Sequence, residues 1–392
     1  MSDRRFGPYR SAADLPSRDG VIAGYVLKLA RESASLTQPA LASALEVDTG
    51  TLQSWESGRR SLAATNVRDF VRLRLRLLQL GVAPNLIDAI DDALSADYLL
   101  GYVLRTDPDE ADPAEHPLAC WLLPRSVSAM LAWPLTGTPP SALRVPAVPH
   151  RRRGPVPTGP ALTGTERQRF FVHLRGAANR MRLSRRAHRD RRALFTHQAY
   201  YRAGWDRSAD STRWLRRAYA NHTREPGSLT RWSADWLAAR ALVIALACHG
   251  DPEPLCHFVR TGHQSDETEI ANLNYWAYWI GELGERQQSH KFMPQSDVFQ
   301  RWSGGRLTAH LVGRLRPDPD LELNVHTLVT LLHRPAPRHF LEHDDTLASR
   351  LRAALDRLSA GTTHLSTHAR RELDRIARLT APMRRAAAGS GP

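Results

Sequence analysis

Lysine and cysteine are scarce in this chain. Lysine occurs only at Lys28 and Lys291 among 392 residues, so nearly all of the 54 basic residues are arginine. That bias indicates a GC-rich bacterial genome rather than a particular function. The three cysteines, Cys120, Cys248 and Cys256, are too few for a disulfide framework. We therefore predict a cytoplasmic protein.

Long apolar runs are also missing. The longest apolar stretch, Trp236 to Cys248, is interrupted by Arg240 and is too short to span a bilayer. The first residues, MSDRRFGPYRSAAD, include arginines but lack the apolar segment of a signal peptide. These two absences predict a protein that neither spans a membrane nor is secreted.

Signatures of catalysis are missing as well. The chain has no G-x-x-x-x-G-K-[ST], G-x-G-x-x-G, H-E-x-x-H or G-x-S-x-G motif, so we predict a protein that is not an enzyme and has no cofactor. One stretch gathers the possible metal ligands Cys248, His249, Cys256, His257 and His263. Their spacing fits no common zinc module, and His339 and His343 are typical of surface histidines. We therefore predict no metal site.

Positive charge, by contrast, is abundant. The net charge is +14, and a chain this basic is expected to bind a polyanion. Residues 144–192 contain fourteen arginines against two acidic residues. Two interpretations stay open: a sequence-independent, salt-sensitive contact with nucleic acid, or the solvated face of a helix. Within this stretch, Arg151, Arg152 and Arg153 lie near prolines and are the better candidates for a phosphate-binding strap.

Composition divides the chain into five segments. No long run alternates apolar and polar residues as a strand does, so we predict an all-α protein. We expect a flexible arm (1–20), a small helical domain (21–104), a Pro/Arg-rich linker (105–164), a larger helical domain (165–380) and a disordered tail (381–392). The linker contains twelve prolines, which should prevent long helices.

The larger domain shows repeated helical periodicity. We predict helices at 166–182, 190–204, 211–221, 229–248, 253–261, 267–285, 296–312, 320–333, 343–359 and 364–380. A stacked, tetratricopeptide-like array would suit them, although no clean 34-residue repeat signature is present. Leu273, Trp276, Ala277 and Ile280 share one helical face, which is either core or the lining of a ligand pocket or partner groove. This domain is expected to serve dimerisation, partner binding or ligand sensing.

The small domain carries the most informative pattern. Helices are predicted at 21–33, 38–45 and 49–57, with Thr37 and Asp48 as N-caps of the second and third and Gly58 just beyond the third. Two short helices joined by about three residues form a helix-turn-helix. Further helices are predicted at 65–80, 84–94 and 96–104, and some of them are expected to complete a five-helix domain.

The third of these helices has two different faces. At about 100° per residue, Leu52 and Trp55 point inward, whereas Gly50, Gln53 and Ser54 point outward after Thr49. This outward face is small, polar and uncharged, so it suits the edges of bases in a major groove. Gln38 begins the second helix, where its side chain and the helix N-terminus can bind a phosphate. Arg59 and Arg60 follow the third helix and can reach the DNA backbone.

The elements Leu36-Thr37-Gln38, Leu41-Ala42, Val47 and Trp55-Glu56-Ser57-Gly58-Arg59 resemble the Xre, or lambda-repressor-like, family of bacterial DNA-binding proteins. The resemblance covers a minor part of the chain. It implies DNA contacts by Gln38, Thr49, Gly50 and Ser54, with Gln53 near them. It also implies a structural ion pair between Arg31 and Glu56. Gly50 departs from the family, which commonly has a larger side chain there, so base contacts are expected to be fewer.

Together these features predict a nucleoid-associated transcriptional regulator. It would bind double-stranded DNA as a homodimer on two half-sites about one helical turn apart. The alternative is a helical scaffold for protein partners that the small domain tethers to DNA.

Overall fold

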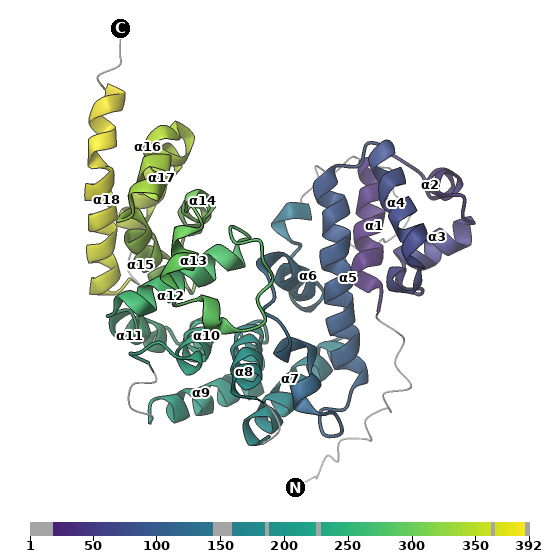
Figure 1. Cartoon of the computed structure of the whole chain (residues 1–392), viewed down its shortest axis with the longest axis horizontal. Helices are drawn as coiled ribbons and strands as arrows, with labels where there is room; N and C mark the ends of the chain where they lie inside the picture. The colour runs from purple at the N-terminus through teal and green to yellow at the C-terminus, as the bar shows by residue number, and fades with distance from the viewer. Residues whose placement is uncertain (1–18, 144–158, 185–187, 225–228, 362–364, 389–392) are drawn as a thin grey trace. The chain divides into compact units, whose positions relative to one another are not determined.

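The computed structural model describes residues 19–143, 159–184, 188–224, 229–361 and 365–388. These residues form helices, turns and irregular segments without any strand, which confirms the prediction of an all-α fold (Figure 1). The chain divides into two compact units. The first unit comprises Met1–Pro113 and Arg125–Arg180, and the second unit comprises Ala114–Pro124 and Met181–Pro392.

The first unit is built around one long helix. Its elements are α1 (Val21–Ser33), α2 (Gln38–Leu45), α3 (Thr49–Glu56), η2 (Leu62–Ala64), α4 (Val67–Gln79), α5 (Pro84–Arg105), α6 (Arg125–Thr136), η5 (Ser141–Leu143) and most of α7 (Gly164–Leu183). Helices α1, α4 and α6 all pack against α5. The short helices α2 and α3 pack against each other, and α3 also packs against α1.

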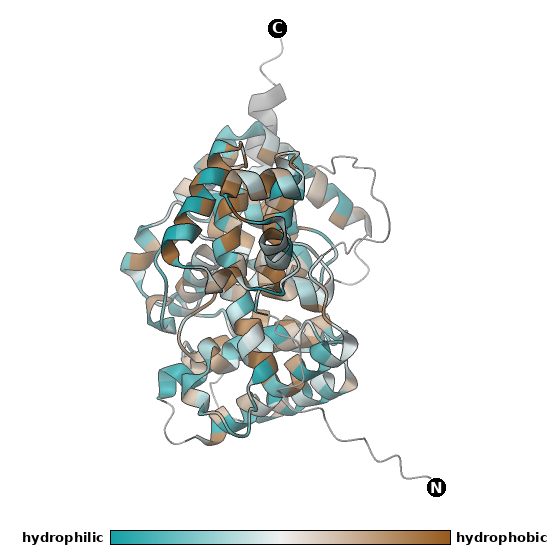
Figure 2. Ribbon diagram, turned by 90° about the vertical axis from the view of Figure 1, so that its right-hand side faces the viewer, coloured by the Kyte–Doolittle hydropathy of each residue, from teal (hydrophilic) through white to brown (hydrophobic). Residues whose placement is uncertain are grey.

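The second unit contains the remaining helices. They are η4 (Pro117–Ala119), α8 (Arg189–Ala203), α9 (Ala209–His222), α10 (Ala234–Cys248), α11 (Glu253–Thr261), α12 (Asp266–Trp279), η6 (His290–Phe292), α13 (Ser296–Gln300), α14 (Gly305–Arg314), α15 (Leu321–Leu332), α16 (Pro335–His343), α17 (Asp345–Gly361) and α18 (Thr367–Ala388); η3 (Pro113–Glu115) lies at the boundary. Most helices carry both apolar and polar residues along their length, as Figure 2 shows. Helix α12 is buried on every side from Ala271 to Tyr278, more completely than the single predicted face. Leu273 and Trp276 belong to one core cluster, and Tyr275 and Tyr278 belong to another.

The first three helices match the sequence-based boundaries closely. Helices α1 and α2 have the predicted bounds, and α3 ends one residue earlier. The side chain of Thr37 accepts a hydrogen bond from the Ala40 N–H, and that of Asp48 accepts one from the Thr51 N–H. Gly58 lies just beyond α3 with a φ of +70°. The predicted caps are therefore confirmed.

Other boundaries differ from the prediction. Residues 84–105 form one helix instead of two, because Ser95 is no helix breaker and its hydroxyl donates to the Asp91 carbonyl one turn back. The predicted linker holds a helix, α6, that includes Pro134 near its end. Pro134 removes one backbone hydrogen bond of this helix, and the packing of the buried apolar residues of α6 against α5 offsets that cost.

In the larger predicted domain, Gly304 divides the expected helix 296–312 into α13 and α14. Its φ of +85° is a conformation that favours glycine. Helix α16 begins at Pro335 and was not predicted. Most of the arm (1–18), Arg151, Arg152 and Arg153 of the strap, and the end of the tail (389–392) lie outside the described residues.

Among the described residues, none of the helices combines the length and apolar character that crossing a membrane requires.

Asp97 of α5 holds the start of α1. Its two carboxylate oxygens accept hydrogen bonds from the N–H groups of Ile22 (2.9 Å) and Ala23 (2.8 Å), which have no acceptor within the helix. The side chain is almost fully buried, and burial raises its pKa to about 7 although the two N–H donors oppose this shift. Asp97 thus couples the attachment of α1 to pH.

We expect stability to depend on the ionisation of Asp97. Asp97 binds its proton more tightly in the folded chain than in the unfolded chain. The contribution of this proton to the unfolding free energy is therefore complete below about pH 4, the pKa of an unfolded aspartate, and is lost as the pH rises to about 7, the pKa of the folded state. The slope cannot exceed about 1.4 kcal/mol per pH unit. The asparagine of Asp97→Asn does not ionise. The difference in unfolding free energy between the wild type and this variant, measured against pH, therefore reports the ionisation of Asp97 alone. A difference that stays constant from pH 4 to pH 7 would contradict it.

Candidate nucleic-acid interface

A three-residue turn, Glu46–Asp48, sets the direction of α3 relative to α2. Glu46 adopts a left-handed conformation with a φ of +56°, and the Val47 N–H donates to the Ala42 carbonyl at 3.0 Å. Asp48 then begins α3 by accepting from the Thr51 N–H at 2.7 Å. Hydrogen bonds from Thr51 lower the pKa of Asp48, so its carboxylate remains a stable cap at neutral pH.

Two glycines let α3 approach α1 closely. A Cβ at Gly24 of α1 would overlap the carbonyl oxygen of Trp55 in the last turn of α3. A Cβ at Gly58 would lie 2.7 Å from the Cα of Val21, at the start of α1. The end of α3 is therefore in direct backbone contact with α1.

A chain of polar contacts runs from α1 to the outer side of α3. The Arg31 guanidinium donates to Glu56 through Nε (2.6 Å) and Nη2 (3.0 Å), and both side chains are buried. Glu56 also accepts from the amide of Gln38 at 2.8 Å, and Gln38 accepts from the amide of Gln53 at 3.4 Å. The buried ion pair thus fixes Gln38, which in turn positions Gln53.

The side of α3 opposite its buried residues is uncharged and open. We define the α3 edge as Thr49, Gly50, Gln53, Ser54 and Ser57. Gly50, Gln53 and Ser57 are exposed, and Thr49 and Ser54 are half-buried, whereas Leu52 and Trp55 lie in the core. Small hydroxyl, amide and backbone groups on a convex edge can hydrogen-bond to another polar surface without steric or charge penalties.

Exposed cations lie directly after the α3 edge. Arg59 and Arg60 are both exposed, and the Arg59 Nε donates to the hydroxyl of Ser57 at 3.2 Å. This hydrogen bond places the Nε of Arg59 next to the α3 edge. The α3 edge therefore has cations at its C-terminal end and the exposed carboxylate of Asp48 at its N-terminal end. Cations beside an uncharged surface can neutralise the phosphates next to contacted bases.

The predicted site residues are therefore distributed as follows. The structure brings together Arg31, Glu56, Gln38 and Gln53 in one network, with the rest of the α3 edge beside them. Gln38 is half-buried, and its amide donates to Glu56 and accepts from Gln53, so its expected phosphate contact stays a prediction. The sequence did not predict that Gln38 positions Gln53. The presence of one glutamine on each of the two adjoining helices, α2 and α3, was the only local signal for this contact.

The arginine-rich stretch is partly engaged in local contacts. The side chains of Arg180, Arg191 and Arg192 donate to the carbonyls of Pro108, Ala114 and Ser184, respectively. Arg167 and Arg182 are exposed. Some members of this stretch therefore hold loops in place, while others face solvent.

No family model, curated protein or solved structure matches this chain.

Proposed function

We propose that this chain is a transcriptional regulator that binds double-stranded DNA sequence-specifically, with the α3 edge in the major groove. The observation that carries the proposal is an open, uncharged edge on a short helix whose opposite side is locked into the core. Gln53 and Ser54 would contact bases, Thr49 and Gly50 would allow close approach, and Arg59 and Arg60 would contact phosphates. Gln38 would act mainly by positioning Gln53.

Rigidity of the site supports this proposal. Recognition by side-chain amides needs them held in place before the DNA arrives, because ordering them on binding costs free energy. The contact between Gln53 and Gln38, backed by Glu56 and Arg31, supplies such ordering. The close backbone contact at Gly24 prevents α3 from shifting on α1.

We further propose that the regulator acts as a homodimer. Helix α4 exposes four aliphatic side chains, Val67, Val71, Leu75 and Leu78, which are 79%, 47%, 55% and 44% exposed. A contiguous row of this kind on a soluble chain is typical of an association surface. A dimer would recognise two half-sites about one helical turn apart, so a selected duplex should contain a repeated half-site.

Binding isotherms on a duplex selected from a random pool would test the base-reading role. We expect Gln53→Ala or Ser54→Ala to weaken binding to that duplex by about 1–3 kcal/mol and to leave binding to random duplexes nearly unchanged. Arg59→Ala should weaken both alike and reduce the slope of log K against log salt by about one unit. Asn85→Ala, at an exposed position on α5, is the matched control.

Equal losses on selected and random DNA for Ser54→Ala would refute its base-reading role. If the wild-type chain shows no preference for any duplex while its second unit captures a defined protein, the scaffold alternative holds instead.

A further inference from the structure

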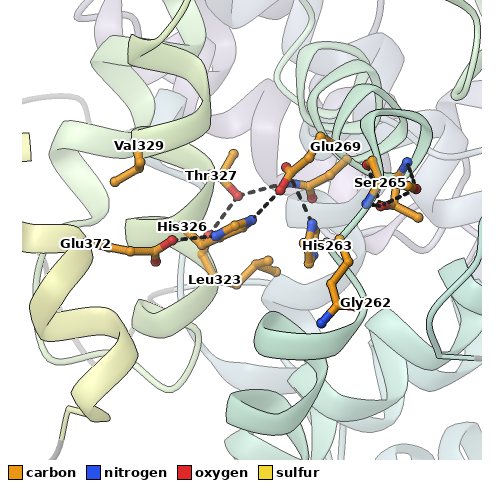
Figure 3. A network of polar contacts seen from close by, with 12 residues as sticks. Gly262, His263, Ser265, Glu269, Leu323, His326, Thr327, Val329 and Glu372 are labelled. Atoms are coloured by element: carbon orange, nitrogen blue, oxygen red, sulfur yellow. Dashed lines mark hydrogen bonds and ion pairs between the residues drawn. The ribbon is translucent and has the colours of Figure 1, made fainter. Parts of the chain in front are cut away.

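Buried histidines and carboxylates meet in the second unit, far from the α3 edge in sequence (Figure 3). His263 precedes α12, Glu269 lies on α12, His326 lies on α15, and Glu372 lies on α18. His326 is hydrogen-bonded through Nε2 to Glu269 at 2.8 Å and through Nδ1 to Glu372 at 2.7 Å. One imidazole thus lies between two carboxylates.

The side of this cluster nearest His263 has unused hydrogen-bonding capacity. The side chain of His263 is only 1% exposed, and among the described residues its Nε2 has no hydrogen-bond partner, while its Nδ1 has only a long contact with Glu269. That contact joins Nδ1 to the second carboxylate oxygen of Glu269 at 3.6 Å, which is too long for a hydrogen bond, and this oxygen accepts no other hydrogen bond from the described residues. Buried polar atoms without partners are costly, so this arrangement indicates a missing third component.

We propose that His263, Glu269 and His326 bind one divalent transition-metal ion, with Zn²⁺ as the best fit. Two imidazoles and one carboxylate are the donors that Zn²⁺ prefers, and three protein ligands leave one coordination position for water or another ligand. One donor atom from each of the three residues lies within 4.8 Å of the others. Tetrahedral coordination needs donors about 3.4 Å apart, so the 2.8 Å contact between Nε2 of His326 and Oε1 of Glu269 must widen slightly as the ion enters.

Glu372 fits the role of a carboxylate behind a metal ligand. When Nε2 of His326 binds the metal, Nδ1 carries the proton and donates to Glu372 at 2.7 Å. This carboxylate–histidine–metal arrangement orients the ring and fixes its tautomer. It also balances charge, because a dication compensates Glu269 and Glu372 together while both histidines stay neutral.

The proposal replaces the sequence-based expectation of no metal site. That expectation considered His263 together with the nearby cysteines, whereas the structure places it beside Glu269 and His326. The ligands come from α12, α15 and the segment preceding α12, and Glu372 adds α18. The ion would therefore fasten these helices together, independently of whether the first unit binds DNA.

Metal analysis of the purified full chain, without an affinity tag, tests the proposal. After chelation and titration with Zn²⁺ alone, we expect one tightly bound ion per chain, and with Co²⁺ alone the visible absorption of a four-coordinate site. His263→Asn and His326→Gln should each abolish stoichiometric binding, and Glu372→Gln should weaken it roughly 10–100-fold. The control is His343→Asn, in an exposed pair with His339, which should bind as the wild type does.

Two results would overturn the proposal. One is a wild-type chain that binds no stoichiometric Zn²⁺ or Co²⁺. The other is metal binding that survives His326→Gln but is lost in His343→Asn. Should a ligand variant fail to fold, paramagnetic shifts of the His263 and His326 ring protons in the Co²⁺-loaded wild-type chain decide the question, and unshifted rings would refute it.

Discussion

Replacing Glu56 with alanine is expected to lower the unfolding free energy of the first unit by about 3–5 kcal/mol. The substitution leaves the Arg31 guanidinium buried without its carboxylate and removes the acceptor of the Gln38 amide. An uncompensated buried charge costs far more than an intact pair contributes. Urea unfolding, monitored by hydrogen exchange of the α1–α3 amides, measures the change in unfolding free energy. The affinity for DNA should decrease together with that stability.

Two comparisons separate the buried charge from general damage. Glu342→Ala breaks an exposed pair with Arg338 and should cost less than about 1 kcal/mol. The double substitution Arg31→Met, Glu56→Leu removes both charges and should recover much of the stability lost in Glu56→Ala. If Glu56→Ala proves as mild as Glu342→Ala, the buried pair does not hold the site together.

Gly24→Ala is expected to cost about 3 kcal/mol, because the added methyl group overlaps the backbone carbonyl of Trp55. A backbone atom cannot move aside as a flexible side chain can, so α3 must shift on α1. We expect a lower thermal midpoint for the first unit together with weaker binding to the selected duplex, measured by calorimetry and by binding isotherms.

Gly164 offers the matched control for this substitution. It begins α7, and an added Cβ there meets nothing within 4 Å, so Gly164→Ala should leave both measurements nearly unchanged. Gly24→Ala with wild-type stability and affinity would show that close backbone contact between α1 and α3 is dispensable.

Local signals explain why the sequence predicted α1–α3 well. Thr37 and Asp48 cap helices through hydrogen bonds three residues away, and Gly58 lies just beyond the end of α3. Such signals can be read from neighbouring residues alone. The orientation of Gly50, Gln53 and Ser54 follows from helical periodicity in the same way, so the α3 edge was also visible in the sequence.

The features that were missed depend on residues distant in sequence. Asp97 binds the start of α1 from more than seventy residues away, and nothing near Asp97 indicates that partner. His326 joins Glu269 and Glu372 across separations of 57 and 46 residues. Packing of α6 against α5 likewise outweighed the local effect of Pro134, which the composition of residues 105–164 could not reveal.

Photo-crosslinking from the α3 edge tests the central claim most directly. A benzophenone amino acid placed at Ser57, which is exposed at the end of this edge, should crosslink to the selected duplex within a half-site. The same probe at Tyr98, which is 63% exposed on α5, should give no crosslink. Crosslinking from Tyr98 but not from Ser57 would contradict the proposal that α3 enters the major groove.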